Sequence, residues 1–263
     1  MTILDKIIAE KYKEVDAQKR LVSVAQLEKR EAFSRPSLSL KASLTRSGST
    51  GIIAEFKRKS PSKGIINDEV RVEDVTFGYA NAGAAGLSVL TDRQFFGGSI
   101  IDLVAARSVN QIPVLRKDFM VDEYQIIEAK AMGADVILLI AASLDVPLIK
   151  KLATCAKSLG LEILFEIHAE EELEKIIDEV DMVGVNNRNL HDFKVDIEHS
   201  LRLAAQLPSQ FVKVSESGID NPETIKYLRN NGFRGFLIGE NFMKQMDPGA
   251  ACKDFIKELS IDI

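Results

Sequence analysis

Short apolar runs rich in β-branched residues recur along the chain and are typical of buried β-strands. About eight such runs are present, at residues 51–56, 87–91, 112–117, 135–141, 162–167, 182–186, 211–215 and 235–239. Runs that are almost continuously apolar, such as Asp-Val-Ile-Leu-Leu-Ile at 135–140, belong in parallel sheets that are covered on both faces. The pattern therefore predicts a buried parallel sheet.

Most of these runs are separated by segments in which apolar residues follow helical spacing. Val72, Val75, Tyr79 and Ala82 share one face of such a segment. Several segments end at a glycine just before the next run, where a helix commonly needs a left-handed residue. These glycines are Gly83, Gly133, Gly160 and Gly232. The chain thus repeats a strand-helix unit.

About eight strand-helix units fit a closed barrel, so we predict an α/β fold, a (β/α)8 TIM barrel, over residues 49–263. The alternative, a doubly wound open sheet, favours fewer strands and usually has a glycine-rich phosphate loop after the first strand. No Gly-x-Gly-x-x-Gly segment follows residues 51–56. Because 263 residues are an ordinary length for one barrel, we predict a single domain over 1–263.

Residues 1–48 do not fit this repeat. Ile3, Ile7, Ile8 and Tyr12 form a helical stripe, which a charged segment and a Ser-Arg-Pro-Ser turn follow. We therefore predict a helical N-terminal extension that packs on the barrel.

Composition narrows the class of protein. Hydrophobic residues make up 46% of the chain and charged residues 28%, which is typical of a globular protein with a sizeable core. The net charge of -5 and the scattered basic residues argue against nucleic acid or an anionic membrane as a partner. With no apolar leader and no run long enough to span a bilayer, we expect a cytoplasmic protein. We expect a monomer, and an oligomer stays open.

The two cysteines, Cys155 and Cys252, lie far apart and have no Cys-x-x-Cys partner or neighbouring histidine. We interpret them as buried free thiols rather than as metal or redox groups.

Polar residues that end the apolar runs carry the candidate chemistry, because barrel active sites lie at the carboxyl ends of the strands. In Ala-Glu-Phe-Lys the two-residue period puts Glu55 and Lys57 on one face. Lys117 shares its face with Phe119 at the end of the third run. Glu166 ends the fifth run, where a buried carboxylate is costly unless it is paired, so a lysine is its natural partner.

The last runs add amide, guanidinium and hydroxyl groups to the same face. Alternation places Gly184, Asn186 and Arg188 together, and it places Ser215 and Ser217 together. Glycines at the junctions after the last two runs, Gly218 and Gly239, leave backbone N–H groups free to bind phosphate.

Other polar residues near these ends have simpler interpretations. Alternation or loop position takes Arg116, Lys59 and Lys63 off the inner face and favours solvated or secondary roles, and Asp118 could cap a turn. The histidines, His168, His191 and His199, lack metal-ligand spacing and receive no role. A single polar strand end is often only solvated loop, but two Glu, two Lys, an Asn and an Arg at successive ends favour acid/base and ion-pair chemistry without a metal.

Six segments in order resemble the indole-3-glycerol phosphate synthase family, and the resemblance extends to about Met243. They are Glu-Phe-Lys-Arg-Lys-Ser-Pro-Ser-Lys-Gly, Ser-Val-Leu-Thr-Asp, Arg-Lys-Asp-Phe, Gly-Val-Asn-Asn-Arg-Asn-Leu, Ser-Glu-Ser-Gly-Ile and Phe-Leu-Ile-Gly-Glu. The first is the most diagnostic, whereas the last two also occur in other phosphate-binding barrels.

The resemblance implies a lyase of tryptophan biosynthesis. Such an enzyme converts 1-(2-carboxyphenylamino)-1-deoxyribulose 5-phosphate into indole-3-glycerol phosphate, with release of CO₂ and water. It implies no metal and no organic cofactor, and its small-molecule partner is an anionic sugar phosphate that carries an anthranilate group.

The resemblance also implies catalytic roles for five residues. Lys117 resembles the general acid that protonates the ribulose carbonyl, and Lys57 the ion-pair partner of the substrate carboxylate, with proton transfer by Lys57 left open. Glu55 and Glu166 resemble the carboxylates that stabilise cationic intermediates and move protons during dehydration, in an order that stays open. Asn186 resembles the residue that holds substrate hydroxyls and a neighbouring carboxylate.

Substrate-binding positions follow in the same way. Ser60, Gly218, Gly239 and the backbone N–H of Glu240 resemble the phosphate site. Ser217 and Arg188 resemble further substrate contacts, and Phe119 resembles the wall against the anthranilate ring.

Two rival functions remain to be distinguished. Another phosphate-binding barrel enzyme, such as phosphoribosylanthranilate isomerase, would need a Cys and Asp pair at strand ends, and neither cysteine is at one. A barrel without turnover that only binds a sugar phosphate or a partner enzyme would not need the five catalytic candidates.

Overall fold

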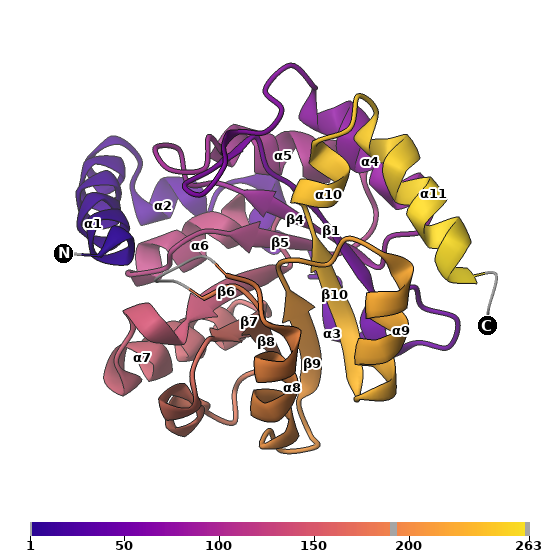
Figure 1. The fold of residues 1–263 in the computed structure, drawn as a ribbon. Helices are drawn as coiled ribbons and strands as arrows, with labels where there is room; N and C mark the ends of the chain where they lie inside the picture. The colour runs from indigo at the N-terminus through magenta and orange to yellow at the C-terminus, as the bar shows by residue number, and fades with distance from the viewer. Residues whose placement is uncertain (1, 190–193, 261–263) are drawn as a thin grey trace.

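Eight parallel strands close into a barrel within residues 2–189 and 194–260, which the computed structural model describes (Figure 1). Their order around the barrel is β1, β10, β9, β8, β7, β6, β5, β4. The strands are β1 (Ile52–Phe56), β4 (Gly86–Leu90), β5 (Val114–Lys117), β6 (Val136–Ile140), β7 (Glu162–Ile167), β8 (Met182–Asn186), β9 (Val212–Glu216) and β10 (Phe233–Ile238). The predicted barrel is therefore confirmed, with each strand boundary within two residues of its apolar run.

Helices follow the strands and form the outer layer. They are α4 (Val72–Ala82), α5 (Ile100–Val109), α6 (Glu123–Ala131), α7 (Val146–Ser158), α8 (Ile197–Ala205), α9 (Pro222–Asn230), α10 (Glu240–Met243) and α11 (Pro248–Ser260), with short 3-10 turns at η2 (Ala141–Ser143) and η3 (Glu170–Lys175). The helix-ending glycines have the predicted left-handed backbone, with φ of 99° at Gly83 and 90° at Gly232. In Figure 1 the C-terminal α11 lies along α4.

Alternation along the strands separates two apolar cores. Leu115, Leu164 and Val214 belong to a cluster inside the barrel, and each lies two residues before a polar strand end. Leu40 and Leu44 of α3 (Leu40–Thr45) pack into the same cluster. Side chains of opposite alternation pack under the outer helices. The interior is therefore filled at the amino ends of the strands and polar at the carboxyl ends.

The N-terminal segment is helical, as predicted, and packs on one side of the barrel. It contains α1 (Ile3–Leu21), α2 (Val24–Leu27), η1 (Glu31–Ser34) and α3. Helix α1 contacts α6 and η2 (Figure 1). The predicted stripe is wrong at Tyr12, which is 48% exposed, because Ile7, Lys11 and Val15 form the buried face.

A small antiparallel hairpin, β2 (Lys59–Ser60) and β3 (Gly64–Ile65), follows β1 and was not predicted. Each strand has two residues, so no alternation of apolar and polar positions could reveal it. Within the described ranges, no helix combines the length and the apolar composition that crossing a bilayer requires.

Candidate active site

A cavity of about 310 Å³ opens at the carboxyl ends of the barrel strands. Its volume is at the lower end of the range of small-molecule sites. All residues that the sequence put forward for catalysis or substrate binding line it, namely Glu55, Lys57, Ser60, Lys117, Phe119, Glu166, Asn186, Arg188, Ser217, Gly218, Gly239 and Glu240. The fold thus brings together side chains from most of the strands.

Two lysine-glutamate pairs occupy the floor of the cavity. The Lys57 Nζ lies 2.9 Å from Glu55 Oε1, and the Lys117 Nζ lies 3.3 Å from Glu166 Oε2. Asn186 Nδ2 donates to the other oxygen of Glu166 at 2.9 Å. Each buried carboxylate therefore has the cationic partner that its burial requires.

The charges in this cluster shift one another's pKa values. Burial lowers the pKa of Lys117, but the carboxylates of Glu166, Glu216 and Glu55 outweigh it and raise that pKa above its ordinary value. Burial raises the pKa of Glu166, but Lys117, His168 and Asn186 outweigh it and hold that pKa well below its ordinary value. At neutral pH Lys117 is therefore an ammonium and Glu166 a carboxylate. A lowered pKa would ease proton donation by Lys117, whereas the pKa of Lys117 in this structure is raised.

Glu216 is a cavity residue that the sequence reasoning missed. Its side chain is 1% exposed and lines the cavity two residues after the inward Val214. The prediction that Ser215 joins the cavity is wrong, because Ser215 Oγ is buried and accepts from Asn187 Nδ2 at 3.0 Å. The predicted run, 211–215, ended one residue before β9 does. A shift of one residue moves a side chain from the inner to the outer face of a strand. Ser217 lines the cavity although its φ of 70° breaks the alternation.

The environment of Glu216 favours a neutral carboxyl group. Burial, followed by the nearby carboxylate of Glu166, raises the pKa of Glu216 well above its ordinary value. Gly184 faces this carboxyl so closely that a Cβ there would lie 2.0 Å from Glu216 Oε1. The cavity therefore holds a carboxyl group with a raised pKa beside one with a lowered pKa, an arrangement that suits proton transfer in both directions.

His168 is a second residue to which the sequence assigned no role. It lines the cavity, its side chain is buried, and its Nε2 lies 3.1 Å from Glu166 Oε1. Glu172 Oε2 accepts from its backbone N–H at 2.5 Å and fixes this segment after β7. The sequence could have indicated His168, because it lies two residues after Glu166 and therefore on the same face of the strand. His199 contacts the carbonyl oxygen of His168, and His191 lies outside the described residues.

One end of the cavity offers backbone N–H groups and small side chains. Gly239 is the N-cap of α10, and no side chain caps that helix. Gly218 has a φ of 70°, and the buried Ser60 also lines the cavity. The carboxylate of Glu240 lies 3.6 Å from Arg188 and 3.7 Å from Lys63, so its side chain is already engaged. Exposed helix N–H groups near basic side chains suit a phosphate.

The other end of the cavity is apolar. The rings of Phe96 and Phe119 lie 6.0 Å apart between centroids, and both line the cavity. Ile3, Leu4 and Ile7 of α1 complete this wall. The contribution of α1 could not be inferred from spacing, because the helix lies far from the strand ends in sequence. This end suits a planar aromatic group.

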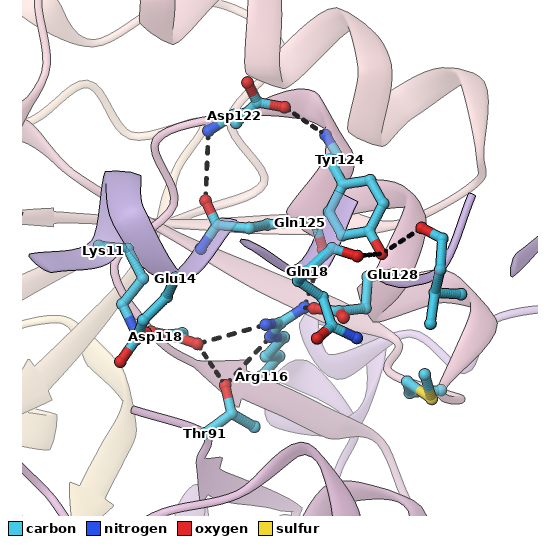
Figure 2. Close-up of polar contacts among 12 residues, drawn as sticks. Lys11, Glu14, Gln18, Thr91, Arg116, Asp118, Asp122, Tyr124, Gln125 and Glu128 are labelled. Atoms are coloured by element: carbon cyan, nitrogen blue, oxygen red, sulfur yellow. Dashed lines mark hydrogen bonds and ion pairs between the residues drawn. The ribbon is translucent and has the colours of Figure 1, made fainter. Parts of the chain in front are cut away.

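A buried ionic network lies directly outside the cavity floor (Figure 2). Arg116 donates through Nε to Thr91 Oγ1 at 3.0 Å, and its guanidinium lies 3.3 Å from Asp118 and 2.9 Å from Glu128. Of the two interpretations offered for Arg116, a solvated or a secondary role, the solvated one is therefore wrong, since the residue is only 4% exposed. Alternation correctly took it off the inner face, but the outer face of this strand lies under helices.

Across residues 2–189 and 194–260, no group of three or more His, Cys, Asp or Glu residues could hold a metal ion. Cys155 and Cys252 are free thiols, half-buried in α7 and buried in α11. Neither lies at a strand end.

Comparison with known proteins shows the family that this chain resembles along nearly its whole length. A sequence model of the family described as Indole-3-glycerol phosphate synthase matches residues 4–255. An indole-3-glycerol phosphate synthase from Bacteroides thetaiotaomicron is 52% identical over 257 residues, which cover 98% of each chain. One from Burkholderia vietnamiensis is 45% identical over 95% of this chain and 97% of its own.

Solved structures with the same fold are more distant in sequence. A chain of the tryptophan synthase complex from Pyrococcus furiosus aligns with a TM-score of 0.58 and 16% identity, covering 82% of this chain and 99% of its own. A thiamine phosphate pyrophosphorylase from the same organism gives 0.57 and 16%, covering 84% and 100%. At such identity the likeness concerns the barrel fold alone.

Proposed function

Because this chain belongs to the indole-3-glycerol phosphate synthase family, we propose how its cavity divides the work of that reaction among its side chains. The chain is a carbon-carbon lyase of tryptophan biosynthesis. It converts 1-(2-carboxyphenylamino)-1-deoxyribulose 5-phosphate into indole-3-glycerol phosphate, CO₂ and water. The observation that carries the proposal is the presence of two separate lysine-glutamate pairs between a phosphate-like end and an apolar end of one cavity.

The two ends orient the substrate. The phosphate binds the backbone N–H groups at Gly218, Gly239 and Glu240, together with Ser60, and the anthranilate ring lies against Phe119. Arg188 and Ser217 add contacts to the sugar phosphate. Both reacting carbons then lie over the charged floor, where the protein supplies groups that are already oriented.

Ring closure needs a proton for the ribulose carbonyl and an anchor for the substrate carboxylate. Lys117 is the general acid: it gives its proton to the carbonyl oxygen as the ring carbon attacks, and the loss of CO₂ restores the aromatic ring. Lys57 forms the ion pair with the carboxylate until CO₂ leaves. The raised pKa of Lys117 keeps its proton in place until the oxygen develops negative charge beside it.

Dehydration needs one acid and one base. The hydroxyl group made in the first step leaves as water after it accepts a proton, and the substrate gives up a proton to a carboxylate. Glu216, whose pKa is raised, is suited to donate, while Glu166, whose pKa is lowered, is suited to accept and Glu55 to stabilise positive charge. Asn186 holds Glu166 in place and binds a substrate hydroxyl.

The test is formation of indole product, followed by its fluorescence, from the purified chain without added metal. Lys117→Ala should lower kcat by roughly 10²–10⁴-fold, the usual worth of a general acid. Lys57→Ala should raise KM as well, because the carboxylate loses its anchor. Lys150→Ala, on the exposed face of α7, is the matched control and should behave as the wild type. Near wild-type turnover in Lys117→Ala would contradict the assigned role.

Two rival activities are separated by the same assay. A barrel that only binds a sugar phosphate gives no indole product. An isomerase of the phosphoribosylanthranilate type needs a cysteine acid or base in the cavity, whereas Cys155 and Cys252 lie in outer helices.

We also propose that the chain acts in the cytoplasm as a monomer. The mild net charge and the high content of charged residues support this. Light scattering during size-exclusion chromatography tests the oligomeric state, and a mass twice that of one chain would contradict it.

A further inference from the structure

Lys11 of α1 is buried where the helix meets the barrel. Its side chain is 4% exposed, and its Nζ lies 2.9 Å from Asp92 Oδ2, 3.0 Å from Asp118 Oδ1 and 2.6 Å from Glu14 Oε2. Figure 2 shows Lys11 and Glu14 reaching from α1 toward Asp118. A buried ammonium is costly to dehydrate, and the carboxylates of Asp92 and Asp118 offset that cost only while the helix stays docked.

Each acidic partner on the barrel also holds an aromatic residue of the cavity. Asp92 Oδ1 accepts from the backbone N–H of Phe95 at 2.8 Å and of Phe96 at 3.2 Å. Asp118 Oδ1 accepts from the backbone N–H of Phe119 at 2.8 Å. Both carboxylates thus fix the backbone that carries Phe96 and Phe119, whose tilted rings are neighbours at the apolar end.

Helix α1 supplies the remaining part of that wall. Ile7 lies four residues before Lys11, on the same helix face, and lines the cavity together with Ile3 and Leu4. Moving α1 would therefore open the apolar end of the cavity. Among the described residues that line the cavity, Lys11 itself is absent, so any effect on the reaction must pass through these neighbours.

We infer that Lys11 is a positioning residue for the aromatic half of the substrate. Its ammonium joins α1, the loop after β4 and the segment after β5, and so keeps Ile7, Phe96 and Phe119 at the spacing that an aromatic ring needs. The inference rests on the proposed function, because the anthranilate group is taken to bind at this end. It predicts an effect on substrate affinity rather than on proton transfer.

The test compares Lys11→Met with Lys13→Met, a matched control on the same helix whose side chain is 74% exposed. Lys11→Met should raise KM by about tenfold or more while kcat stays within about threefold, because the wall shifts but the charged floor does not. Inhibition by inorganic phosphate, which probes only the opposite end, should be unchanged. Lys11→Arg should restore part of the affinity, and Lys13→Met should match the wild type.

The outcomes separate the possible failures. An unchanged KM in folded Lys11→Met, or equal weakening of substrate and phosphate, overturns the role of Lys11. If Lys11→Met does not fold, Asp92→Asn decides: its amide oxygen can still accept from Phe95 and Phe96 while the charge that holds Lys11 is lost. An unchanged KM in that variant also overturns the inference. Absence of indole product from the wild type would instead contradict the proposed function.

Discussion

Gly184→Ala is a perturbation of Glu216 that changes no charge. Gly184 lies in β8 and faces the carboxyl group across the neighbouring strand β9. A Cβ at this position would lie 2.0 Å from Glu216 Oε1 and 3.1 Å from its carboxyl carbon. Gly184 has no positive φ, so alanine brings no backbone strain of its own. The new methyl group must therefore displace the carboxyl.

The size of the displacement follows from the contact distance. Real Cβ atoms essentially never approach another heavy atom closer than 3.0 Å, so the carboxyl oxygen must move by about 1 Å. A misplacement of about 1 Å in a catalytic group costs roughly 100-fold in rate. That loss corresponds to about 2.7 kcal/mol in the activation barrier. We expect it in kcat, because the residue is assigned to dehydration and not to substrate binding.

The assay is steady-state indole formation in a double-mutant cycle. Gly184→Ala should lose activity in the wild-type background, but in a Glu216→Ala background it should change kcat by less than about threefold, because no carboxyl remains to be displaced. Thermal unfolding of each variant checks that the barrel is intact. A single variant that keeps wild-type kcat would refute the role of Glu216. An equal loss in both backgrounds would show that the methyl group acts on the strands instead.

Three further predictions concern stability, each measured by urea unfolding. Asp135→Asn should destabilise the fold by about 3–5 kcal/mol, since Asp135 is fully buried and its oxygens lie 2.6 Å from Arg35 and 2.9 Å from Arg107; a loss below ~1 kcal/mol would contradict this. Gly78→Ala should cost about 1–3 kcal/mol without changing KM, because its Cβ would lie 2.9 Å from the Cα of Gly249 in α11; unchanged stability would mean that the two helices can separate freely. Burial raises the pKa of Cys252 from 9.0 to about 12, so the thiol stabilises the fold fully below pH 9 and loses that contribution as the pH rises toward 12. Cys252→Ala should therefore lose roughly 2 kcal/mol less stability than the wild type between pH 9 and 11, and equal slopes of stability against pH would refute the shift.

The amino-acid sequence was sufficient for the architecture because the barrel repeats one local unit. Apolar runs of strand length and helix-ending glycines such as Gly83 are local signals, and the eight runs are the number that a closed barrel of this type needs. Strand alternation also placed Glu55, Lys57 and Lys117 on the inner face. Side chains alternate between the two faces, so one residue whose face is known assigns the others in its strand.

Strand alternation gave a wrong inward residue in β9, where the end of the strand was misplaced by one residue. Strand β9 extends to Glu216, one residue beyond the predicted end, and Val214 points into the barrel. Glu216 therefore points inward, whereas the prediction had placed Ser215 there. The ends of elements are the least certain part of any pattern, and in a β-strand an error of one residue reverses every side chain.

Contacts between distant segments were decided by the tertiary structure alone. Nothing local to α1 indicates that Lys11 binds Asp92 and Asp118, or that Ile7 reaches the cavity, because these groups become neighbours only when the helix docks on the closed barrel. The same holds for the pKa values of Lys117 and Glu216, which depend on burial and on charges from several strands. The sequence therefore determined which groups end the strands, and the packing of the barrel determined which of them form ion pairs and which side chains line the cavity.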